Sequence, residues 1–503
     1  MNPIDSFFEH IRKQHPDPDS FVDFIAACKR PLRKSIRVNT LKISVDDFKG
    51  LAAKRGWILT PIPWCKEGFW IDHNPEKEPL QLGNCGEHLM GLFYIQEASS
   101  MLPAEALLSG LSTEPNGLDA NKMVLDMAAA PGSKTTQLAA IMSNEGTLLA
   151  NELSASRLKV LHANLQRCGV TNACMSHLDG TLLDKRLSGC FDAILLDAPC
   201  GGEGTYRKDP KALDNWSLNA IETISQVQKQ LLLAAWKMLK PGGRMIYSTC
   251  TLSREENQQV IESLQSDILS EMTIVSLAAL FPEALFPEAK RAITKEGFLQ
   301  VWPEIFDCEG FFVACIEKST SAIVESAPVL QNQSPFKPLT GKTITLIEDY
   351  YQQHFGFDMS DLSNRLRIRD SHHEQQIWLF PEQGDRLRQA LKLQRSGIRI
   401  CDLISSRQGP LIKTQHEFVI SYGNALKSQT VELDSCQAES CCRGENIQLQ
   451  EADQLKKGEV VMLYQGYPLG LAKALPAQKK QQQKITLKNN LPRDLLRSNA
   501  DFL

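Results

Sequence analysis

The stretch that decides the fold is MVLDMAAAPGSKTTQLAAIMS, residues 123–143. It begins with strand-like residues, passes through a run of small residues and continues with helical spacing. The same order returns in GTLLANEL with SASRLKVLHANLQRCG, and in FDAILLDAP with LNAIETISQVQKQLLLAAWKML. RMIYSTCTL and GFFVACIEK are further strand-like runs, the second closing the series. Alternation of this length predicts an α/β fold: a parallel sheet with helices on both faces.

The chain has 503 residues, and this length alone suggests about three domains. Before the alternating region lies a smaller α/β unit, and after it the composition changes to IVESAPVLQNQSP, which is typical of a linker. We therefore expect an N-terminal extension (1–90), the large α/β domain (91–320), a linker (321–335), a first small C-terminal domain (336–410), a second (411–480) and a basic tail (481–503).

The overall composition excludes several classes of protein. The formal net charge of −4 gives no global sign of nucleic-acid binding, although a locally basic face remains compatible with it. Fourteen cysteines without a regular frame, in a chain without an export signal, indicate reduced thiols and a cytoplasmic protein. No run of about 18 apolar residues occurs, so we expect no membrane association.

Ligands of open parallel sheets bind beyond the carboxyl ends of the strands, where the turn AAAPGSK follows the first strand. The turn matches neither the phosphate loop nor the G-x-G-x-x-G pattern, but its small residues allow a ligand close to the backbone. A plain strand-to-helix turn is the alternative, and a lysine in the first helical turn argues against it because it opposes the helix dipole. The candidate cofactor contacts here are Ala128, Ala129, Ala130, Pro131, Gly132, Ser133 and Lys134.

Two acidic residues follow the next strands. Glu152 is placed to accept hydrogen bonds from ribose hydroxyls, and Asp179 to contact an adenine edge. Either residue alone would be an ordinary loop carboxylate or helix cap. Together, in this order, they suggest a nucleoside cofactor without phosphates.

Cys200 and Cys250 end neighbouring predicted strands at this same edge. Free cysteines are usually buried core residues, which is our interpretation of the other twelve. A thiol at a ligand-binding edge can instead become a nucleophile. No metal-type histidines lie beside either cysteine, so we expect no metal site.

One reaction needs a thiolate, a methyl donor and an acidic group together. Addition of a thiolate to C6 of cytosine makes C5 nucleophilic, C5 then attacks an electrophilic methyl group, and loss of the C5 proton releases the thiol. Asp197, three residues before Cys200, could hydrogen-bond the base. The target base must leave its stack or already lie in unpaired or distorted RNA.

The motifs MAAAPGSKT, LLDAPCGGEGTYRKDP, LKPGGRMIYSTCTLSREEN and EGFFVAC resemble the successive motifs of the Nop/Sun family of RNA cytosine-5 methyltransferases. The resemblance covers roughly residues 1 to 318 and includes SIRVNTLK of the family's N-terminal extension. It implies a Rossmann-like fold and S-adenosyl-L-methionine as cofactor, held by Ala128–Lys134, Glu152, Asp179 and Asp197. Ser133 departs from the glycine common in the family.

The same resemblance assigns nucleophilic attack to Cys250 and help with product release to Cys200. Spacing alone leaves this division open, because DNA cytosine methyltransferases use the cysteine of their P-C motif as nucleophile. In GGEGTYRKDP, residues 201–210, we expect a lid whose Arg207 and Lys208 contact RNA phosphates, an ordinary solvated loop being the alternative.

GYPLGLAK near the C-terminus resembles the end of a PUA-like RNA-binding domain. With the chain length, it implies a subfamily that modifies a decoding-region cytosine of 16S rRNA. The expected partner is therefore 16S rRNA within the 30S subunit, bound by a monomer. Three alternatives remain: the same chemistry on tRNA, a catalytically silent ribosome-assembly factor, and a thiol-redox protein whose two sulfurs lie close enough to bond.

Overall fold

A computed structural model describes residues 2–73, 81–108, 121–268, 271–281, 287–324, 334–371, 374–407, 409–449, 455–475 and 485–502. Its centre is a nine-stranded sheet in the order β10-β12-β9-β8-β5-β6-β7-β16, with β11 paired to β12. The strands are β5 (Met123–Asp126), β6 (Thr147–Asn151), β7 (Ala173–Ser176), β8 (Phe191–Asp197), β9 (Leu239–Thr249), β10 (Met272–Val275), β11 (Leu299–Val301), β12 (Phe311–Lys318) and β16 (Arg395–Ser396).

The five strands β5 to β9 are parallel to one another, and β12 closes the series antiparallel to β9. Chain order reverses between β5 and β8, where the two strands lie side by side. This is the switch point of a Rossmann-like sheet and the position at which such sheets bind ligands. The expected α/β fold is confirmed.

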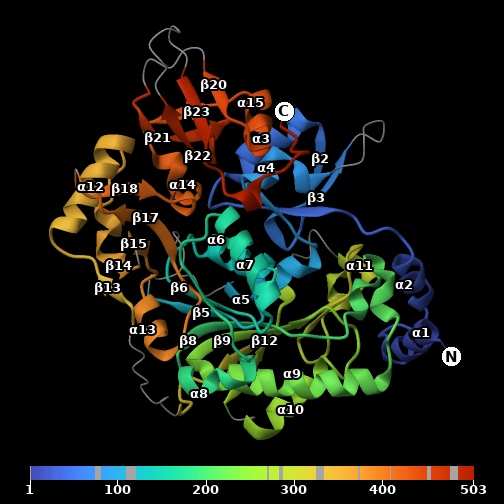
Figure 1. Ribbon diagram of the computed structural model, residues 1–503. Coiled ribbons are helices and arrows are strands. Elements are labelled where there is room, and N and C mark those ends of the chain that lie inside the picture. Colours follow the sequence, from blue (N-terminus) through green and yellow to red (C-terminus); the bar gives the residue numbers. More distant parts are fainter. Residues whose placement is uncertain are drawn as a thin grey trace.

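Helices cover both faces of this sheet (Figure 1). The sheet separates two apolar cores. One contains Leu161 of α7 and Leu138 of α6, and the other contains Leu232 and Trp236 of α9. Helices α7 and α9 bury one side, because their apolar residues recur at helical spacing, whereas α5 and α6 are buried almost throughout. The first face carries α5 (Leu102–Leu108), α6 (Ser133–Ile141) and α7 (Ala155–Arg167); the second carries α8 (Asp184–Leu187), α9 (Leu218–Met238) and α10 (Gln258–Ile268).

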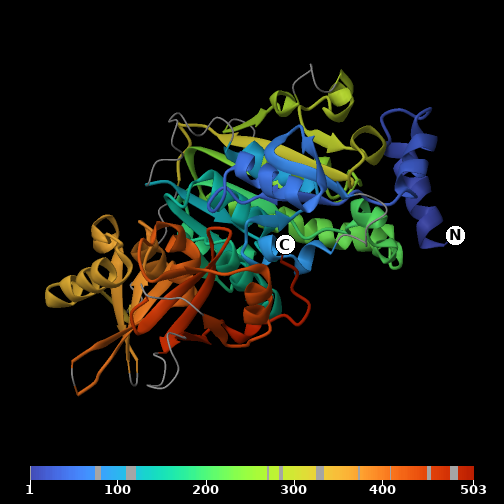
Figure 2. The same cartoon turned by 90° about the horizontal axis from the view of Figure 1, so that it is seen from above.

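The N-terminal part has a four-stranded antiparallel sheet in the order β2-β3-β1-β4. Two preceding helices pack their aromatic side chains against Leu252 and Trp302 of the central domain. Figure 2 shows these helices apart from the sheet that follows them. The elements are α1 (Pro3–Gln14), α2 (Phe21–Cys28), β1 (Ser35–Val38), α3 (Val45–Arg55), β2 (Trp57–Ile62), β3 (Cys65–His73), α4 (Gly86–Leu89) and β4 (Phe93–Ile95).

The C-terminal part contains two five-stranded sheets, ordered β13-β14-β15-β17-β18 and β19-β21-β22-β23-β20. The first comprises β13 (Phe336–Pro338), β14 (Leu366–Asp370), β15 (Glu374–Leu379), β17 (Ile398–Ile404) and β18 (Leu411–Thr414), with α12 (Lys342–Phe355) and α13 (Gly384–Ala390). The second comprises β19 (Thr430–Glu432), β20 (Ile447–Leu449), β21 (Gly458–Tyr464), β22 (Tyr467–Leu475) and β23 (Ile485–Asn489), with α14 (His416–Tyr422) and α15 (Ser435–Cys442).

The expected basic tail, residues 481–503, is wrong as a separate unit. Strand β23 lies between β22 and β20, and its pairing with β22 begins where the GYPLGLAK hairpin strand ends. The last residues then return to the N-terminal part: the N–H of Asp501 donates to the carbonyl of Asn84, and Phe502 is buried (Figure 1). Composition marked the segment as polar, whereas the apolar residues of β23 and Phe502 fix it. Most of the expected linker, residues 325–333, lies outside the described residues.

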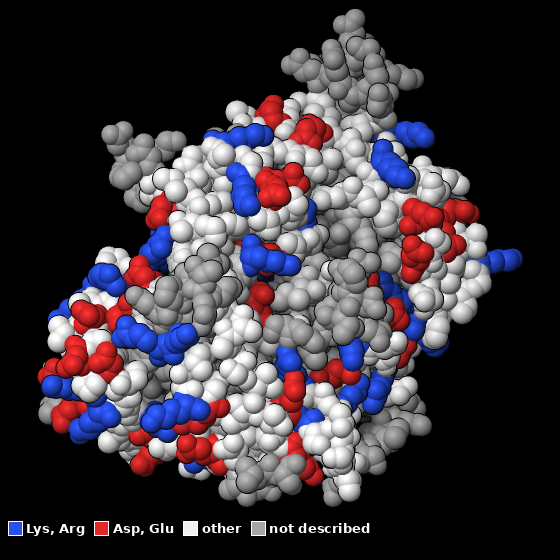
Figure 3. Space-filling view, turned by 180° about the vertical axis from the view of Figure 1, so that it is seen from behind, with Lys and Arg blue, Asp and Glu red and all other residues white. Residues whose placement is uncertain are grey.

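The back of the molecule carries lysine and arginine interspersed with aspartate and glutamate, without one broad region of a single sign (Figure 3). This agrees with the small net charge of −4. Within the described part of the chain, no helix has the length and apolar character needed to cross a membrane.

Candidate active site

The two cysteines lie on loops that leave neighbouring parallel strands. Asp197 at the end of β8 is in register with Ser248 near the end of β9, and Cys200 and Cys250 follow within three residues. Their Sγ atoms are 3.3 Å apart, well beyond the ~2.05 Å of a disulfide bond. Both are free and half-buried. The remaining twelve cysteines are all buried except Cys436, which is exposed.

The side chain of Asn257 hydrogen-bonds both threonines beside Cys250. The Thr249 hydroxyl donates to the Asn257 side-chain oxygen at 2.5 Å, and the Asn257 amide donates to the Thr251 carbonyl at 3.1 Å. The Gly204 N–H donates to the Cys250 carbonyl at 2.9 Å. A Cβ at Gly204 would lie 2.0 Å from the Gly310 carbonyl oxygen, so only glycine allows this close approach.

Glu203, three residues after Cys200, is a residue that sequence reasoning missed. Its carboxylate is buried and accepts hydrogen bonds from the loop that carries Cys250. The donors are the hydroxyls of Thr251 and Ser253, the backbone N–H groups of Leu252 and Ser253, and the indole of Trp216. A buried carboxylate with several donors is a strong structural tie, because charge-assisted hydrogen bonds are stronger than neutral ones.

Glu256, six residues after Cys250, makes the reciprocal contact and was also missed. Its carboxylate accepts the N–H of Gly201 at 2.9 Å and the amide of Gln228 at 2.8 Å. Burial, and then the charge of Glu203, raise the pKa of Glu256 to about 7. We call Glu203 and Glu256 the carboxylate clasp, because each extends from one cysteine loop to the backbone of the other.

The environments of the two thiols differ. The pKa of Cys200 is raised well above its ordinary value, first by its contact with Cys250, then by burial and by the charges of Cys250, Glu256 and Asp197. Cys200 therefore remains a thiol at neutral pH. The charge of Cys250 is one of the causes that raise the pKa of Lys134.

Two contacts offset the unfavourable position of Lys134 in the first turn of α6. Its ammonium lies 2.8 Å from the Asp197 carboxylate and donates to the Ser100 hydroxyl at 2.8 Å. Burial lowers the pKa of Lys134, but the charge and hydrogen bond of Asp197 outweigh it and the net shift is upward. The Asp197 carboxylate also accepts the Ser248 hydroxyl at 2.8 Å, so the structure joins these sequence-predicted residues in one network.

The turn Ala128–Lys134 is shaped by its neighbours. Gly132 has φ of 106°, and a Cβ there would meet Leu161 at 2.9 Å. The buried Glu152 accepts the N–H of Ala130 at 3.3 Å, so the structure brings this predicted carboxylate to the turn. Arg37, a buried residue of β1, donates to the Ser133 carbonyl at 2.9 Å and thereby ties the N-terminal sheet to the turn.

Asp126, at the end of β5, is a further buried carboxylate that sequence reasoning did not single out. One oxygen accepts the Thr135 hydroxyl at 2.6 Å, while the other has no partner among the described residues. Burial raises the pKa of Asp126 to about 7. An ammonium group of a bound ligand would satisfy this oxygen, so the turn, Glu152 and Asp126 fit a nucleoside that carries an amino-acid chain.

Asp179 lies after β7, as expected, but its carboxylate is partly occupied. It is exposed and caps a short 3-10 helix, accepting the N–H and hydroxyl of Thr181 at 2.9 and 2.8 Å. Its contact with an adenine edge stays a prediction.

The expected phosphate-binding role of Arg207 is wrong. Its side chain is buried and donates to the carbonyls of Arg30, Pro31 and Cys308 and to Asp307 at 2.8 Å. The segment Glu203–Arg207 forms a 3-10 helix in place of an open lid. Lys208 is exposed. The hydrogen bonds of Arg207 connect sequence-distant loops, which the local pattern Y-R-K could not reveal.

One group of described side chains has metal-ligand atoms close together, namely Cys65, Glu67 and Glu105. This group includes neither Cys200 nor Cys250.

Comparison with known proteins identifies the family. Three family models match the chain. The model of "16S rRNA methyltransferase RsmB/F" matches residues 116–317, that of the "N-terminal domain of 16S rRNA methyltransferase RsmF" matches residues 4–98, and that of the "Methyltransferase RsmF PUA domain" matches residues 428–497. Ribosomal RNA small subunit methyltransferase F of Shewanella sp. (strain W3-18-1) is 47% identical over 99% of this chain and 97% of its own length. The chain belongs to the ribosomal RNA small subunit methyltransferase F family.

A second methyltransferase F, from Psychromonas ingrahamii, is 44% identical over 99% of this chain and 98% of its own length. Among solved structures, PH0851 is 29% identical with a TM-score of 0.54, covering 62% of this chain and 65% of that chain. NSun6 from Pyrococcus horikoshii, 23% identical with a TM-score of 0.51, covers 61% and 96% and supports the fold. As a methyltransferase F, the chain is an S-adenosyl-L-methionine-dependent enzyme of small-subunit rRNA with a PUA domain.

Proposed function

We propose that this enzyme methylates carbon 5 of a decoding-region cytosine in 16S rRNA through a covalent bond between Cys250 and C6 of the base. The observation that carries the proposal is the pair of free thiols, 3.3 Å apart, at the ends of two neighbouring strands beside Asp197. One cysteine is enough for addition and for the elimination that follows. A second thiol within contact distance of the first can assist its release.

S-adenosyl-L-methionine, when bound, would supply the electrophilic methyl group, and its methyl–sulfur bond would break to leave S-adenosyl-L-homocysteine. Cys250 is the nucleophile: its thiolate forms the S–C6 bond, which leaves C5 electron-rich and able to form a bond to the methyl carbon. Loss of the C5 proton, which ends in solvent, restores the C5–C6 double bond and breaks the S–C6 bond.

Cys200 assists the release step. Its raised pKa keeps it protonated, so it does not compete with Cys250 for C6. Its position at 3.3 Å from the Cys250 sulfur lets it hydrogen-bond that sulfur as the thiolate departs. Removal of Cys200 is expected to stall the enzyme on its product.

Asp197 binds the base. Its carboxylate is held by Lys134 and Ser248, which leaves lone pairs for the exocyclic amine of the cytosine. The cofactor is held by Ala128–Lys134 and Glu152, with Asp126 satisfied by the amino group and Asp179 directed to the adenine. The N-terminal extension, residues 1–90, and the PUA domain, matched at residues 428–497, contact the rRNA. The enzyme acts as a cytoplasmic monomer on the 30S subunit and uses no metal.

The test offers labelled S-adenosyl-L-methionine and purified enzyme separately to 30S subunits, naked 16S rRNA and tRNA, and maps 5-methylcytosine. We expect label at one 16S cytosine, in 30S subunits. Label on tRNA alone would replace the substrate, label on another atom would overturn the cytosine-C5 chemistry, and no transfer would favour the silent assembly factor.

A further inference from the structure

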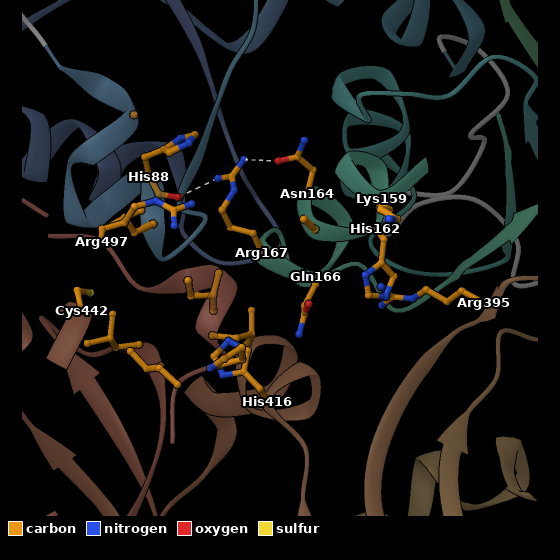
Figure 4. A pocket seen from close by; sticks show the side chains of 18 of the residues that line it. His88, Lys159, His162, Asn164, Gln166, Arg167, Arg395, His416, Cys442 and Arg497 are labelled. Carbon is orange, nitrogen blue, oxygen red and sulfur yellow. Dashed lines mark hydrogen bonds between the residues drawn. The ribbon is translucent and has the colours of Figure 1, made fainter. Parts of the chain in front are cut away.

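A cavity of about 570 Å³ lies away from the catalytic cysteines, where three parts of the chain meet. Gly83 and His88 come from the N-terminal part, Lys159 from α7, and His416 from α14 (Figure 4). Its volume is within the range of about 300–1,000 Å³ that is usual for small-ligand sites. None of the active-site contacts uses it.

The cavity is basic. Its lining includes the cations Lys159, Arg167, Arg395 and Arg497, and no aspartate or glutamate is among the described residues that line it. Glu417, which is outside the lining, lies 3.5 Å from the Arg395 guanidinium and 3.6 Å from Nε2 of the lining residue His162. Arginine and lysine are the usual protein ligands of phosphate, so the lining suits an anion.

Two buried polar side chains of the lining each have one unpartnered atom. Arg395 is 3% exposed; its Nε donates to the Gly397 carbonyl, whereas its Nη1 has no hydrogen-bond acceptor in the described structure. His416 is 8% exposed, and its Nδ1 is likewise unpartnered. Buried polar atoms of this kind are rare, because burial without a hydrogen bond is unfavourable unless a ligand or water satisfies the atom.

The remaining lining suits a base. Burial, with the cation Lys42, lowers the pKa of His416 to about 3, so the imidazole is neutral and can both donate and accept. Gln166 and Gln394 add amide groups that can meet base edges. An apolar wall completes the cavity: Leu89, Leu158, Met175, Leu469, Leu491 and Leu495.

A second cavity of about 600 Å³ adjoins the first, since Gly83 lines both. Its lining includes Lys34, Lys208 and Glu97. Lys208 belongs to the loop after Cys200, and Glu97 accepts the backbone N–H of Glu309 at 3.1 Å, one residue before the Gly310 that contacts that loop. The second cavity is thus lined both by Gly83 of the first cavity and by Lys208 of the loop that follows Cys200.

We propose that the cavity between α4, α7 and α14 is a nucleotide subsite, which holds one unpaired ribonucleotide of the RNA with its phosphate against the lysine and arginine side chains. This rests on the proposed function, in that the RNA held here is the one methylated at the cysteines. The subsite anchors the strand at a distance from the target base, so that binding here orients the cytosine.

The test measures binding of a 4-thiouridine-containing 16S rRNA fragment to the full chain by fluorescence anisotropy. Lys159→Gln removes an exposed cation of the lining, and Ala163→Trp fills the cavity from an exposed position without changing charge. The matched control is Lys185→Gln, an exposed lysine on α8 outside the lining. CMP and inorganic phosphate serve as competitors.

We expect Lys159→Gln and Ala163→Trp to weaken RNA binding about tenfold, and the control to leave it unchanged. Lys159→Gln should also reduce the salt dependence by about one unit of slope, while Ala163→Trp should not. In methylation assays, KM for RNA should rise at constant kcat. Photo-cross-links should map to residues 158–167 or 394–395.

Equal binding by all three variants, or cross-links confined to other segments, would overturn the subsite. Tight binding of CMP or phosphate that Lys159→Gln abolishes, without loss of RNA affinity, would make the cavity a site for free nucleotides and also overturn it. Wild-type enzyme is assayed for methyl transfer in parallel. Failure of that transfer counts against the proposed function, whereas normal transfer with unchanged variants counts against the subsite alone.

Discussion

The active site and the cavity beside α7 carry charged groups of opposite sign. Around the cysteines lie the buried carboxylates Asp126, Glu152, Glu203 and Glu256, whereas the described residues of the cavity lining include lysine and arginine but no aspartate or glutamate. The carboxylates are engaged by backbone N–H groups, hydroxyls and amides, so they hold the loops of the site in place. Unpartnered atoms occur at both places among the described residues: one Asp126 oxygen at the active site, and Nη1 of Arg395 and Nδ1 of His88 and His416 in the cavity lining.

This difference separates two tasks. In the proposed reaction a neutral cytosine ring needs precise placement against a thiolate, and hydrogen bonds to buried carboxylates hold the loops that provide this placement. An RNA backbone brings a negative charge with every nucleotide, and attraction to cations provides affinity. Substitutions at the two places should therefore have different kinetic signatures, the first in kcat and the second in KM.

Cys250→Ala should have the largest effect on methylation, and it tests the active-site half of the comparison. Loss of the nucleophile removes the covalent route, so methylation should fall by at least about 10⁴-fold. Transfer of labelled methyl groups to 30S subunits measures it. Cys436→Ala, at an exposed cysteine, is the control and should keep full activity. Activity within tenfold of wild type would remove Cys250 from the reaction.

Glu203→Gln should give the next largest effect. A glutamine places an NH₂ donor among the hydroxyl and N–H donors that the carboxylate now accepts, so the Cys250 loop loses its position. We expect kcat to fall about 10²-fold with little change in KM, and unfolding to become easier by about 2–4 kcal/mol. Steady-state kinetics and thermal denaturation measure these. The exposed Glu262→Gln is the matched control. A rise in KM alone would erase the contrast with the basic cavity.

Glu256→Gln should give a smaller effect, visible in the pH dependence of stability. Burial raises the pKa of Glu256 from 4.5 to about 7, so the folded state binds its proton more tightly than the unfolded state does. This contribution to stability is complete below pH 4.5 and is lost as pH rises through 7. The unfolding free energy of wild type minus that of Glu256→Gln should therefore fall by about 1–3 kcal/mol between pH 4.5 and pH 8.

Denaturant unfolding at several pH values measures this difference. Asp126, whose pKa burial also raises to about 7, titrates in both proteins and cancels from it. A difference that stays constant or grows with pH would show that Glu256 is ionised throughout, as an exposed carboxylate would be.

The sequence was sufficient for the parallel sheet and for the residues at its carboxyl edge. Strand-like runs end directly before the turn Ala128–Lys134, Glu152, Asp197 and Cys250, and parallel strands bring their ends together whatever the helices between them do. The closeness of Cys200 and Cys250 follows from the same rule. Their separation of 3.3 Å does not, because it depends on how the two loops are tied.

What sequence reasoning missed is the tying itself. Glu203 lies three residues after Cys200 and Glu256 six residues after Cys250, so their positions could have drawn attention. Only the folded chain shows that Glu203 contacts the loop of Cys250 and that Glu256 contacts the loop of Cys200. Arg207 was misassigned for the same reason, since its partners come from residues 30, 31, 307 and 308. Strand β23 was missed because its polar flanks hide a short apolar alternation.

The most direct test of the central claim uses the two cysteine variants with 30S subunits and S-adenosyl-L-methionine, followed by a denaturing gel for protein that remains attached to RNA. Cys200→Ala should accumulate a covalent protein–RNA species, because Cys250 still adds to C6 while release is impaired. Cys250→Ala should form none. A covalent species with Cys250→Ala and none with Cys200→Ala would contradict the account and make Cys200 the nucleophile.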